Sequence, residues 1–404
     1  MTSTHSAPTQ PTATRRQGWR VAVVTETYPP EVNGVAVTIS RIVEGLRAQG
    51  HQVQLIRPRQ AGDANRTTND CLMRGLPIPR YPDLRMGLPA TGELLRRWRE
   101  ARPDVVHLVT EGPLGWSALR AARRLGLPVV SDFRTNFHAY TEHYGLSWLR
   151  RPIVAYLRHL HNRTACTMVP TAALQQELAG MGFERLQVVA RGVDAQRFHP
   201  GLRSGDLRRE WGADDDTPVV LCVGRLAPEK NLDAVVAAWR AMAEVNPRTR
   251  LVLVGDGPDR PRLMALAPEA IFMGTQRGDA LARCYASADV FAFASLTETF
   301  GNVVPEAMAS GLAVLAYQHA AAGQLIEHRH NGVLAPAGDE TTFLRLARTL
   351  ASDPAWARHL GQQARETAQA LDWQHILSGI EAQYLAAMSP SPQTSSALRP
   401  ARAG

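Results

Sequence analysis

Short apolar runs alternate with helical lengths along most of the chain. Six runs in the first half have the length and the valine-rich composition of buried strands: 20–25, 53–56, 104–109, 128–131, 166–169 and 186–189. Five runs repeat the pattern in the second half: 218–223, 250–254, 270–273, 289–293 and 313–316. Strands that alternate with helices in this way form parallel sheets covered on both faces, so we expect an α/β protein with two doubly wound domains.

The polar stretch 199–217 lies between the two series of strands and predicts a linker. We therefore expect one Rossmann-like domain over 18–198 and a second over 218–370, with a cleft between them that closes during function. The Pro-, Thr- and Ser-rich ends, 1–17 and 389–404, carry too few apolar groups to repay the entropy of ordering, and we expect them to be disordered.

The most informative segment is 298–311, which reads Glu-Thr-Phe-Gly-Asn-Val-Val-Pro-Glu-Ala-Met-Ala-Ser-Gly. Glu298 falls on the loop after a predicted strand, and Glu306 falls in the helix that follows. Ligands bind at this edge of open α/β sheets. Three residues where this helix begins have backbone amides suited to a diphosphate or to sugar hydroxyls: Phe300, Gly301 and Asn302.

Two carboxylates on either side of a scissile bond also occur in glycoside hydrolases, where they lie about 5 to 10 Å apart. Eight residues along a helix rise about 12 Å, so Glu298 and Glu306 should instead face different parts of one extended ligand and accept its hydroxyl groups. A helix-capping Glu298 beside a solvated Glu306 is the structural alternative, and a bare Glu-x7-Glu spacing favours it. The surrounding motifs reverse that preference.

The segment from Glu298 to Gly311 resembles the Glu-x7-Glu signature of the retaining glycosyltransferases of family 4, which have the GT-B fold of two Rossmann-like domains. Four more segments match this family in order: the glycine loop beneath the donor phosphate at 27–35, the entrance to the linker at 191–200, the diphosphate-binding strand and loop at 223–232, and the nucleotide-side turn at 254–258. The resemblance extends from about residue 20 to 387. Within the family, it is closest to mannosyl- and glucosyl-transferases that act on lipid or glycolipid acceptors.

The resemblance implies a role for each matching residue. Arg225 and Lys230 follow a buried strand in a Gly-Arg-x4-Lys frame and should stabilise the charge that builds on the β-phosphate as the glycosidic bond breaks. Glu306 should bind the ribose, and Glu298 a hydroxyl of the transferred sugar. Three glycines, Gly34, Gly224 and Gly255, complete the expected donor site. The resemblance also implies that 371–388 forms a helix that packs back on the first domain.

One position departs from the family pattern. Many relatives have a histidine at the end of the fourth strand, where this chain has Arg134. An arginine cannot accept a proton at neutral pH, but it can bind a sugar oxygen or a phosphate. His138 follows four residues later, either as a catalytic replacement in the cleft or as a structural histidine. We include both residues in the predicted catalytic set.

Composition and charge limit the kinds of binding partner that this chain is expected to have. The net charge of +8 suggests two kinds of binding partner, nucleic acids and anionic membrane surfaces. The sequence contains no recognised nucleic-acid-binding motif, which favours the membrane. Basic and aromatic residues gather at 94–99 and 145–163 in the predicted acceptor domain, either to bind an anionic membrane surface or as solvated helix faces. No apolar run is long enough to span a bilayer, which predicts a cytoplasmic protein or one peripheral on the inner face of the cytoplasmic membrane.

No cofactor or metal ion is expected. The acidic run 214–216 lies in the predicted linker and is typical of a solvated loop, and the family generally works without a divalent ion. Four widely spaced cysteines predict buried reduced thiols: Cys71, Cys166, Cys222 and Cys284.

We therefore expect a retaining transferase that moves a hexose from a nucleotide-sugar donor, with GDP-mannose favoured, to a lipid or glycolipid acceptor. As in the family, no carboxylate nucleophile is expected, and the departing phosphate helps to deprotonate the acceptor on the same face of the sugar. UDP-glucose or UDP-galactose is the alternative donor. A nucleotide-sugar-binding protein without transfer activity is the alternative class.

Overall fold

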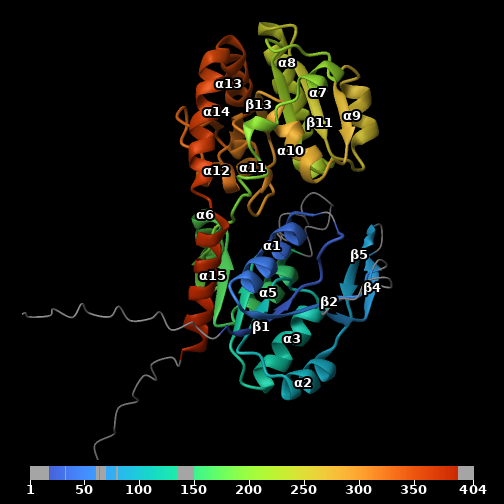
Figure 1. Ribbon diagram of the computed structural model, residues 1–404, viewed down its shortest axis with the longest axis vertical. Coiled ribbons are helices and arrows are strands. Elements are labelled where there is room, and N and C mark those ends of the chain that lie inside the picture. Colours follow the sequence, from blue (N-terminus) through green and yellow to red (C-terminus); the bar gives the residue numbers. More distant parts are fainter. Residues whose placement is uncertain are drawn as a thin grey trace, which may run out of the picture.

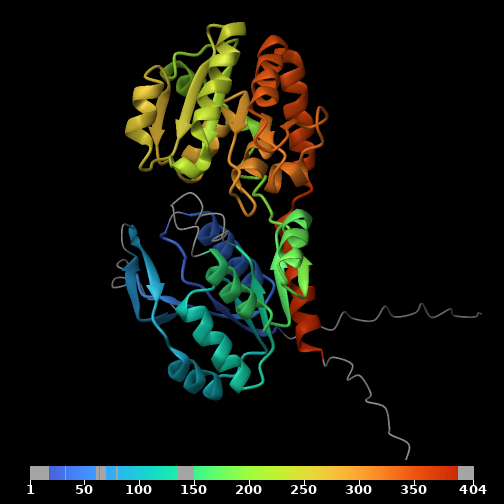
Figure 2. The ribbon, with the colours of Figure 1, turned by 180° about the vertical axis from the view of Figure 1, so that it is seen from behind.

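The computed structural model describes residues 18–31, 33–60, 63, 70–78, 81–134 and 150–389. They form two α/β domains, one above the other in Figure 1, and the same arrangement is seen from behind in Figure 2. The predicted fold class of two doubly wound parallel sheets is confirmed. The predicted disordered ends, apart from Ser389, lie outside the described residues, and so does His138.

In the described part of the N-terminal domain, seven parallel strands pair in the order β3-β2-β1-β6-β7-β8-β9. Their bounds are β1 (Arg20–Val24), β2 (Gln52–Pro58), β3 (Cys71–Met73), β6 (Val105–Leu108), β7 (Val129–Asp132), β8 (Cys166–Val169) and β9 (Leu186–Val188). An antiparallel hairpin joins β4 (Gly75–Ile78) to β5 (Tyr81–Gly87). The helices are α1 (Gly34–Ala48), α2 (Thr91–Glu100), α3 (Pro113–Arg124), α5 (Arg150–His161) and α6 (Ala172–Gly180).

In the C-terminal domain, six parallel strands pair in the order β12-β11-β10-β13-β14-β15. Their bounds are β10 (Val219–Val223), β11 (Arg250–Val254), β12 (Ile271–Gly274), β13 (Val290–Phe293), β14 (Ala313–Tyr317) and β15 (Val333–Ala335). The helices are α7 (Gly205–Glu210), α8 (Leu232–Val245), α9 (Arg260–Leu266), α10 (Gly278–Ala286), α11 (Val303–Ala309), α12 (Ala320–Leu325), α13 (Glu340–Ser352) and α14 (Pro354–Gln369), and α15 (Trp373–Met388) follows them in the chain. Two short 3-10 turns are η3 (Pro200–Leu202) and η4 (Pro228–Lys230).

All eleven strands predicted from the sequence are present, with ends that differ by at most a few residues. The sequence pattern missed β3, β4, β5 and β15. Two of these, β3 and β15, are only three residues long, which is too short to show a strand period. The β4–β5 hairpin contains proline and arginine at several positions, which disfavours a strand interpretation.

Each sheet has a topological switch point. Strand β1 pairs with β2 on one side and β6 on the other, and β10 likewise lies between β11 and β13. The loops that leave β1 and β6, or β10 and β13, therefore diverge to opposite faces and open a crevice at the carboxyl ends of the strands. The predicted donor loops lie at these two points.

The chain crosses between the domains twice. The first crossing follows β9 and the second precedes α15, and the backbone N–H of Val193 donates to the carbonyl of Leu371, 3.1 Å away, where they meet. Gly192 is required here, because a Cβ would lie 2.9 Å from the ring of Trp373.

Helix α15 lies beside the N-terminal domain in both views (Figures 1 and 2). Its buried side chains join the core between the sheet and α1: Ile376, Leu377, Ile380 and Tyr384. The segment 199–217, predicted as a linker, contains η3 and α7, and Trp211 at the end of α7 is buried in the core of the C-terminal domain. The four cysteines are free and buried, as predicted.

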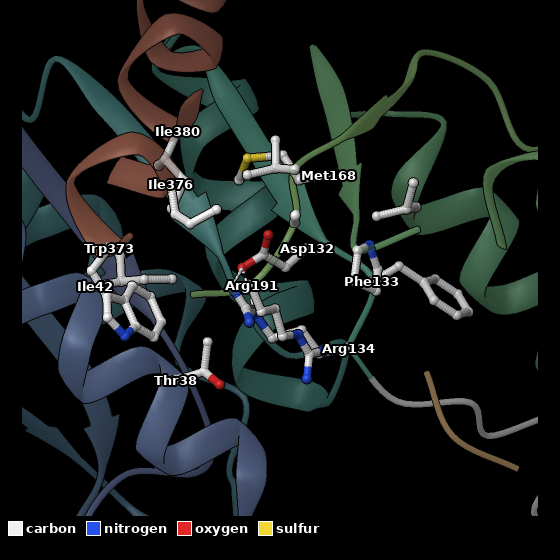
Figure 3. Close-up of a pocket in the computed structure, with 14 residues that line it drawn as sticks. Thr38, Ile42, Asp132, Phe133, Arg134, Met168, Arg191, Trp373, Ile376 and Ile380 are labelled. Atoms are coloured by element: carbon white, nitrogen blue, oxygen red, sulfur yellow. Dashed lines mark hydrogen bonds and ion pairs between the residues drawn. The ribbon is translucent and has the colours of Figure 1, made fainter. Parts of the chain in front are cut away.

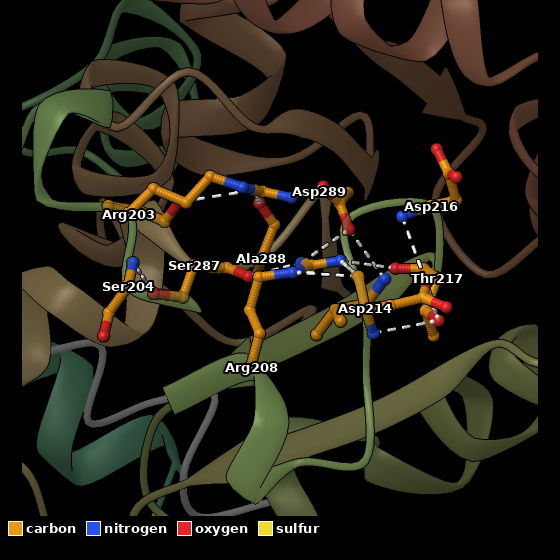
Figure 4. A network of polar contacts seen from close by, with 11 residues as sticks. Arg203, Ser204, Arg208, Asp214, Asp216, Thr217, Ser287, Ala288 and Asp289 are labelled. Atoms are coloured by element: carbon orange, nitrogen blue, oxygen red, sulfur yellow. Dashed lines mark hydrogen bonds and ion pairs between the residues drawn. The ribbon is translucent and has the colours of Figure 1, made fainter. Parts of the chain in front are cut away.

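A buried guanidinium fixes this segment to the C-terminal domain (Figure 4). The side chain of Arg208 is 1% exposed and donates to the carbonyl oxygens of Ser287, Asp214 and Thr217. It also forms an ion pair with Asp289, with 3.2 Å between Nη1 and Oδ2. Asp214, the first residue of the acidic run, accepts a hydrogen bond from the Thr217 hydroxyl at 2.6 Å, so it stabilises a turn.

Replacing Arg208 by methionine should lower the free energy of unfolding by about 3–5 kcal/mol, because several buried carbonyl oxygens and Asp289 lose their partner together. Urea denaturation measures this change. The matched control is Arg209→Met, since Arg209 is 73% exposed and pairs only with the exposed Asp206 among described residues. Equal, small changes for the two variants would contradict the structural role of Arg208.

Candidate active site

The two domains contact each other where the predicted donor residues gather. The side chain of Asn302, which precedes α11, donates to the carbonyl of Gly34 at 3.3 Å and to the hydroxyl of Thr38 at 3.1 Å. The predicted phosphate loop of the first domain therefore lies against the predicted donor segment of the second. A Cβ on Gly34 would meet only Asn302, at an ordinary 3.5 Å, so packing within the chain does not require glycine there.

Arg225 and Lys230 lie on the loop that follows β10. Gly224 and Gly255 shape this loop: both have positive φ, and a Cβ on Gly255 would lie 1.8 Å from the carbonyl oxygen of Gly224. The guanidinium of Arg225 forms an ion pair with Glu229, whose side chain is fully buried. Sequence reasoning assigned no role to Glu229, although Arg-x3-Glu is a spacing at which side chains meet on a tight helical turn.

Lys230 forms an ion pair with Glu298, the first glutamate of the Glu-x7-Glu segment. The two side chains are 16% and 17% exposed, and they come from loops that follow the neighbouring strands β10 and β13. The structure thus brings together two residues that the sequence places 68 positions apart. His319 lies next to them, with its Nε2 atom 3.2 Å from the carbonyl of Glu298.

Lys230 is the only lysine in the chain, whose other 44 basic residues, of 45 in all, are arginines. An ammonium is a compact point charge, whereas a guanidinium is a wide planar fork. The single use of lysine in a chain that otherwise uses arginine favours a role in which the compact group is needed.

Glu306 lies in α11 and has a different partner from Glu298. Its Oε2 atom accepts a hydrogen bond from the hydroxyl of Tyr285, 2.9 Å away. Burial raises the pKa of Glu306 to about 7, and the Tyr285 hydrogen bond only partly offsets this. Phe300 and Gly301 lie between the two glutamates in the sequence: Phe300 is buried, and Gly301 adopts a positive φ of 88°.

Arg134 follows β7 and is almost fully buried. Its Nε atom donates to Asp132 at 2.7 Å, and Asp132 also contacts Nε2 of His107 at 2.8 Å. Burial opposes ionisation of Asp132, but Arg134 and His107 outweigh it and hold its pKa well below the usual range. His107 continues the chain of contacts to the hydroxyl of Tyr384 in α15, 2.8 Å away.

The backbone of Arg134 touches the second domain, because its carbonyl accepts a hydrogen bond from the Thr299 hydroxyl at 2.8 Å. Thr299 is adjacent to Glu298, so Arg134 lies near the predicted sugar site. Asp132, Arg134 and Arg191 line one cavity together (Figure 3). His138, the other predicted replacement for the family histidine, lies outside the described residues.

A second pair of buried polar side chains joins Glu111 to His161. Glu111 is buried in the N-terminal domain, with its Oε1 atom 3.5 Å from Nε2 of His161. Within the described ranges, no group of three His, Cys, Asp or Glu side chains is arranged to hold a metal ion. No helix of the described residues is both long and apolar enough to cross a bilayer.

Several site residues were not found from the sequence. Asp132, Tyr285 and His319 lie in no motif that matched the family, and only the fold brings them to the predicted residues. Glu229 lies in the matched segment 223–232, but the match gave it no role. Arg191 is part of a segment that matched the family, but that match gave it no chemical role.

Comparison with known proteins places these residues in context. Residues 32–197 match the family model described as Glycosyltransferase Family 4, and residues 217–353 match the model described as Glycosyl transferases group 1. A Mycobacterium tuberculosis protein named GDP-mannose-dependent alpha-mannosyltransferase is 40% identical over 330 residues, which cover 80% of this chain and 85% of that protein.

The chain is also similar to a more distant relative and to a solved structure. A Streptococcus pneumoniae protein named alpha-monoglucosyldiacylglycerol synthase is 27% identical over 78% of this chain and 75% of its own length. The crystal structure of Anabaena HepE in complex with UDP and glucose superimposes with a TM-score of 0.72 at 19% identity, over 90% of this chain and 98% of that one. At this identity, the likeness shows the fold.

The pKa of Glu306 predicts a pH-dependent donor site. Between pH 8 and pH 6, the ionised fraction of a carboxyl with a pKa of about 7 falls about tenfold. If the carboxylate accepts the ribose hydroxyls, the dissociation constant of a nucleotide sugar should rise about tenfold over this range, as isothermal titration calorimetry can measure. The Glu306→Gln variant should bind more weakly and show a flat profile. A profile of equal slope in that variant would assign the titration to another group.

Proposed function

Because this chain belongs to glycosyltransferase family 4, we propose that it transfers mannose from GDP-mannose to a lipid or glycolipid acceptor with retention of anomeric configuration. The observation that carries the choice of donor is the 40% identity, over most of both chains, to a protein named for GDP-mannose-dependent mannosyl transfer. The chain is a glycosyltransferase, and the gathered residues Lys230, Glu298, Arg225 and Glu306 supply the polar groups that a nucleotide-sugar donor needs.

The ion pair of Lys230 with Glu298 suggests how the donor enters. The β-phosphate of the donor replaces Glu298 as the partner of Lys230, and Glu298 then accepts a hydrogen bond from a hydroxyl of the sugar. Both groups are largely shielded from water, which strengthens their interaction with the charges of the donor. Arg225 adds a second cation at the diphosphate, and Glu306 binds the ribose.

Transfer then takes place on one face of the sugar. The bond from C1 to the phosphate oxygen breaks, and its electron pair goes to the β-phosphate. The acceptor oxygen bonds to C1 from the same side, and its proton goes to the departing phosphate oxygen. Cations that are fixed before the reaction stabilise this developing charge more than they stabilise the bound donor, and so lower the barrier. We propose that Arg225 and Lys230 replace a divalent metal in this role.

The acceptor site belongs to the N-terminal domain in this proposal. The relative named for a diacylglycerol product supports a lipid acceptor. Aromatic and basic side chains lie together on α3 and α5: Trp116 is 6.0 Å from Tyr156 and 5.5 Å from His159 between ring centres, and Tyr156 is 40% exposed. Such a surface suits peripheral attachment to anionic lipid at the cytoplasmic face of the membrane.

A UDP-hexose is the second candidate donor, because the fold is shared with a protein whose structure contains UDP and glucose. A protein that binds a nucleotide sugar without transferring it is the alternative outside the enzymes. All three would use the same donor-site residues of this chain, and measurements of nucleotide selectivity and turnover distinguish them.

Substitution of Lys230 tests the mechanism. Lys230→Ala should reduce kcat by about 100- to 1000-fold, because it removes a fixed charge from the leaving phosphate. Lys230→Arg should stay well below wild type, because the wider guanidinium cannot occupy the same position. Turnover is measured with radiolabelled donor and lipid acceptor, and circular dichroism checks the fold. Wild-type turnover in Lys230→Ala would remove the assignment.

The first experiment on donor choice is a thermal shift of the purified protein with GDP and with UDP at equal concentration, with a chelator present. A ligand at 100 times its dissociation constant stabilises a protein by about 2.7 kcal/mol. We expect a GDP-selective shift without added metal. A UDP-selective shift would replace the mannose proposal with a UDP-hexose, and no shift with either would overturn the donor site.

A further inference from the structure

Arg191 lies at the first crossing between the domains, directly after β9, and its environment is unusual for an arginine. Its side chain is 7% exposed. The Nη1 atom donates to Oδ1 of Asn302 at 3.4 Å, and the guanidinium carbon lies 5.4 Å from the centre of the Phe300 ring. Its Nη2 atom is buried and has no hydrogen-bond partner among the residues that the structure describes.

A buried guanidinium nitrogen without a partner is costly, because the group has left water and gained no hydrogen bond. The nearest carboxylates do not remove this cost. Asp132 is bonded to His107 and Arg134, and Glu298 is paired with Lys230. Burial, followed by repulsion from Arg134, lowers the pKa of Arg191 to about 9, so the side chain is still charged at neutral pH.

The surroundings of Arg191 indicate which anion satisfies it. Phe300 and Asn302 belong to the predicted donor segment, and Asn302 also contacts the carbonyl of Gly34 in the predicted phosphate loop. Arg191 and Arg134 line the same cavity, where the side chains of Asp132, Arg134 and Arg191 cluster (Figure 3). The position combines excess positive charge, an unused donor atom and the loops expected to hold a diphosphate.

We propose that Arg191 is a further catalytic residue, which donates its Nη2 hydrogen to a β-phosphate oxygen of the bound donor. The inference rests on the proposed function and adds a third cation to Arg225 and Lys230. When the C1–O bond breaks and its electron pair moves to the β-phosphate, the charge of Arg191 stabilises the product diphosphate. The same contact distinguishes a nucleoside diphosphate from a monophosphate, which has no β-phosphate to offer.

A purely structural role for Arg191 would require the volume of its side chain but not its charge. Packing on Phe300 and filling the domain crossing need the volume of the side chain, and an uncharged residue of similar length supplies that volume. Arg191→Met keeps the packing and removes the buried charge. We therefore expect its free energy of unfolding, measured in urea without nucleotide, to be no lower than that of the wild type.

Nucleotide binding by this variant is the decisive measurement. Isothermal titration calorimetry is carried out with GDP and GMP, and in parallel with UDP and UMP, on wild type and Arg191→Met. Loss of one charge-assisted hydrogen bond should weaken binding of the preferred diphosphate by about 10- to 100-fold and change binding of the matching monophosphate by less than about twofold. The wild-type comparison of GDP with UDP tests the choice of donor separately, because the effect of Arg191 is read on whichever pair binds.

The control variant is Arg365→Met. Arg365 donates to the carbonyl of Ala309 at the far end of α11, so it supports the same helix without lying near the diphosphate. It should leave the ratio of monophosphate to diphosphate affinity unchanged. Equal weakening of both nucleotides in Arg191→Met would show a structural role and overturn the proposal, as would unchanged binding of both.

Chemical rescue gives a second, independent readout. Arg191→Ala leaves a space for a small guanidinium ion, so guanidine hydrochloride at low millimolar concentration should raise kcat several-fold with a saturable dependence, and should not do so for Lys230→Ala. No saturable rescue, together with unchanged diphosphate affinity, would overturn the assignment. An effect confined to the KM of an acidic lipid acceptor would also overturn it, because it would place the anion on the acceptor.

Discussion

The ion pair between Lys230 and Glu298 is the interaction on which the donor site depends. It joins the loops after two neighbouring strands at the switch point of the C-terminal sheet, and so it fixes the position of the segment that carries Phe300, Asn302 and Glu306. Without donor, each side chain neutralises the other in a site that is mostly shielded from water. An isolated charge there would be costly, which explains why the two residues occur as a pair.

The second organising feature is the set of hydrogen bonds between the two domains. Asn302 reaches Gly34 and Thr38, and Thr299 reaches the backbone of Arg134, so the segment between the two glutamates touches the first domain at two points. Asp132, His107 and Tyr384 continue this network to α15. Polar contacts therefore connect the donor segment to α15.

The strands and the positions of the donor loops could be predicted from the sequence, because buried parallel strands are continuous apolar runs and the ligand-binding loops follow them. That rule put Glu298, Lys230 and Arg225 on loops that follow strands, whereas the family resemblance pointed to Gly34, which begins α1. The contacts between side chains could not be predicted from the sequence. Lys230 meets Glu298, and Glu306 meets Tyr285, only because of the order in which the strands and helices pack. The segment 199–217 has a polar sequence, yet Arg208 and Trp211 bury it against the second domain, which no local pattern indicates.

The return of α15 to the first domain makes the C-terminal domain, in effect, an insertion. Ile376, Leu377, Ile380 and Tyr384 complete a core whose other members come from the first half of the chain. During synthesis, most of the N-terminal domain is made before the C-terminal domain, but this core cannot close until α15 has left the ribosome. Of these two domains, the N-terminal one is thus completed only after the C-terminal one has been synthesised, and until then the face of its sheet that α15 covers is partly exposed.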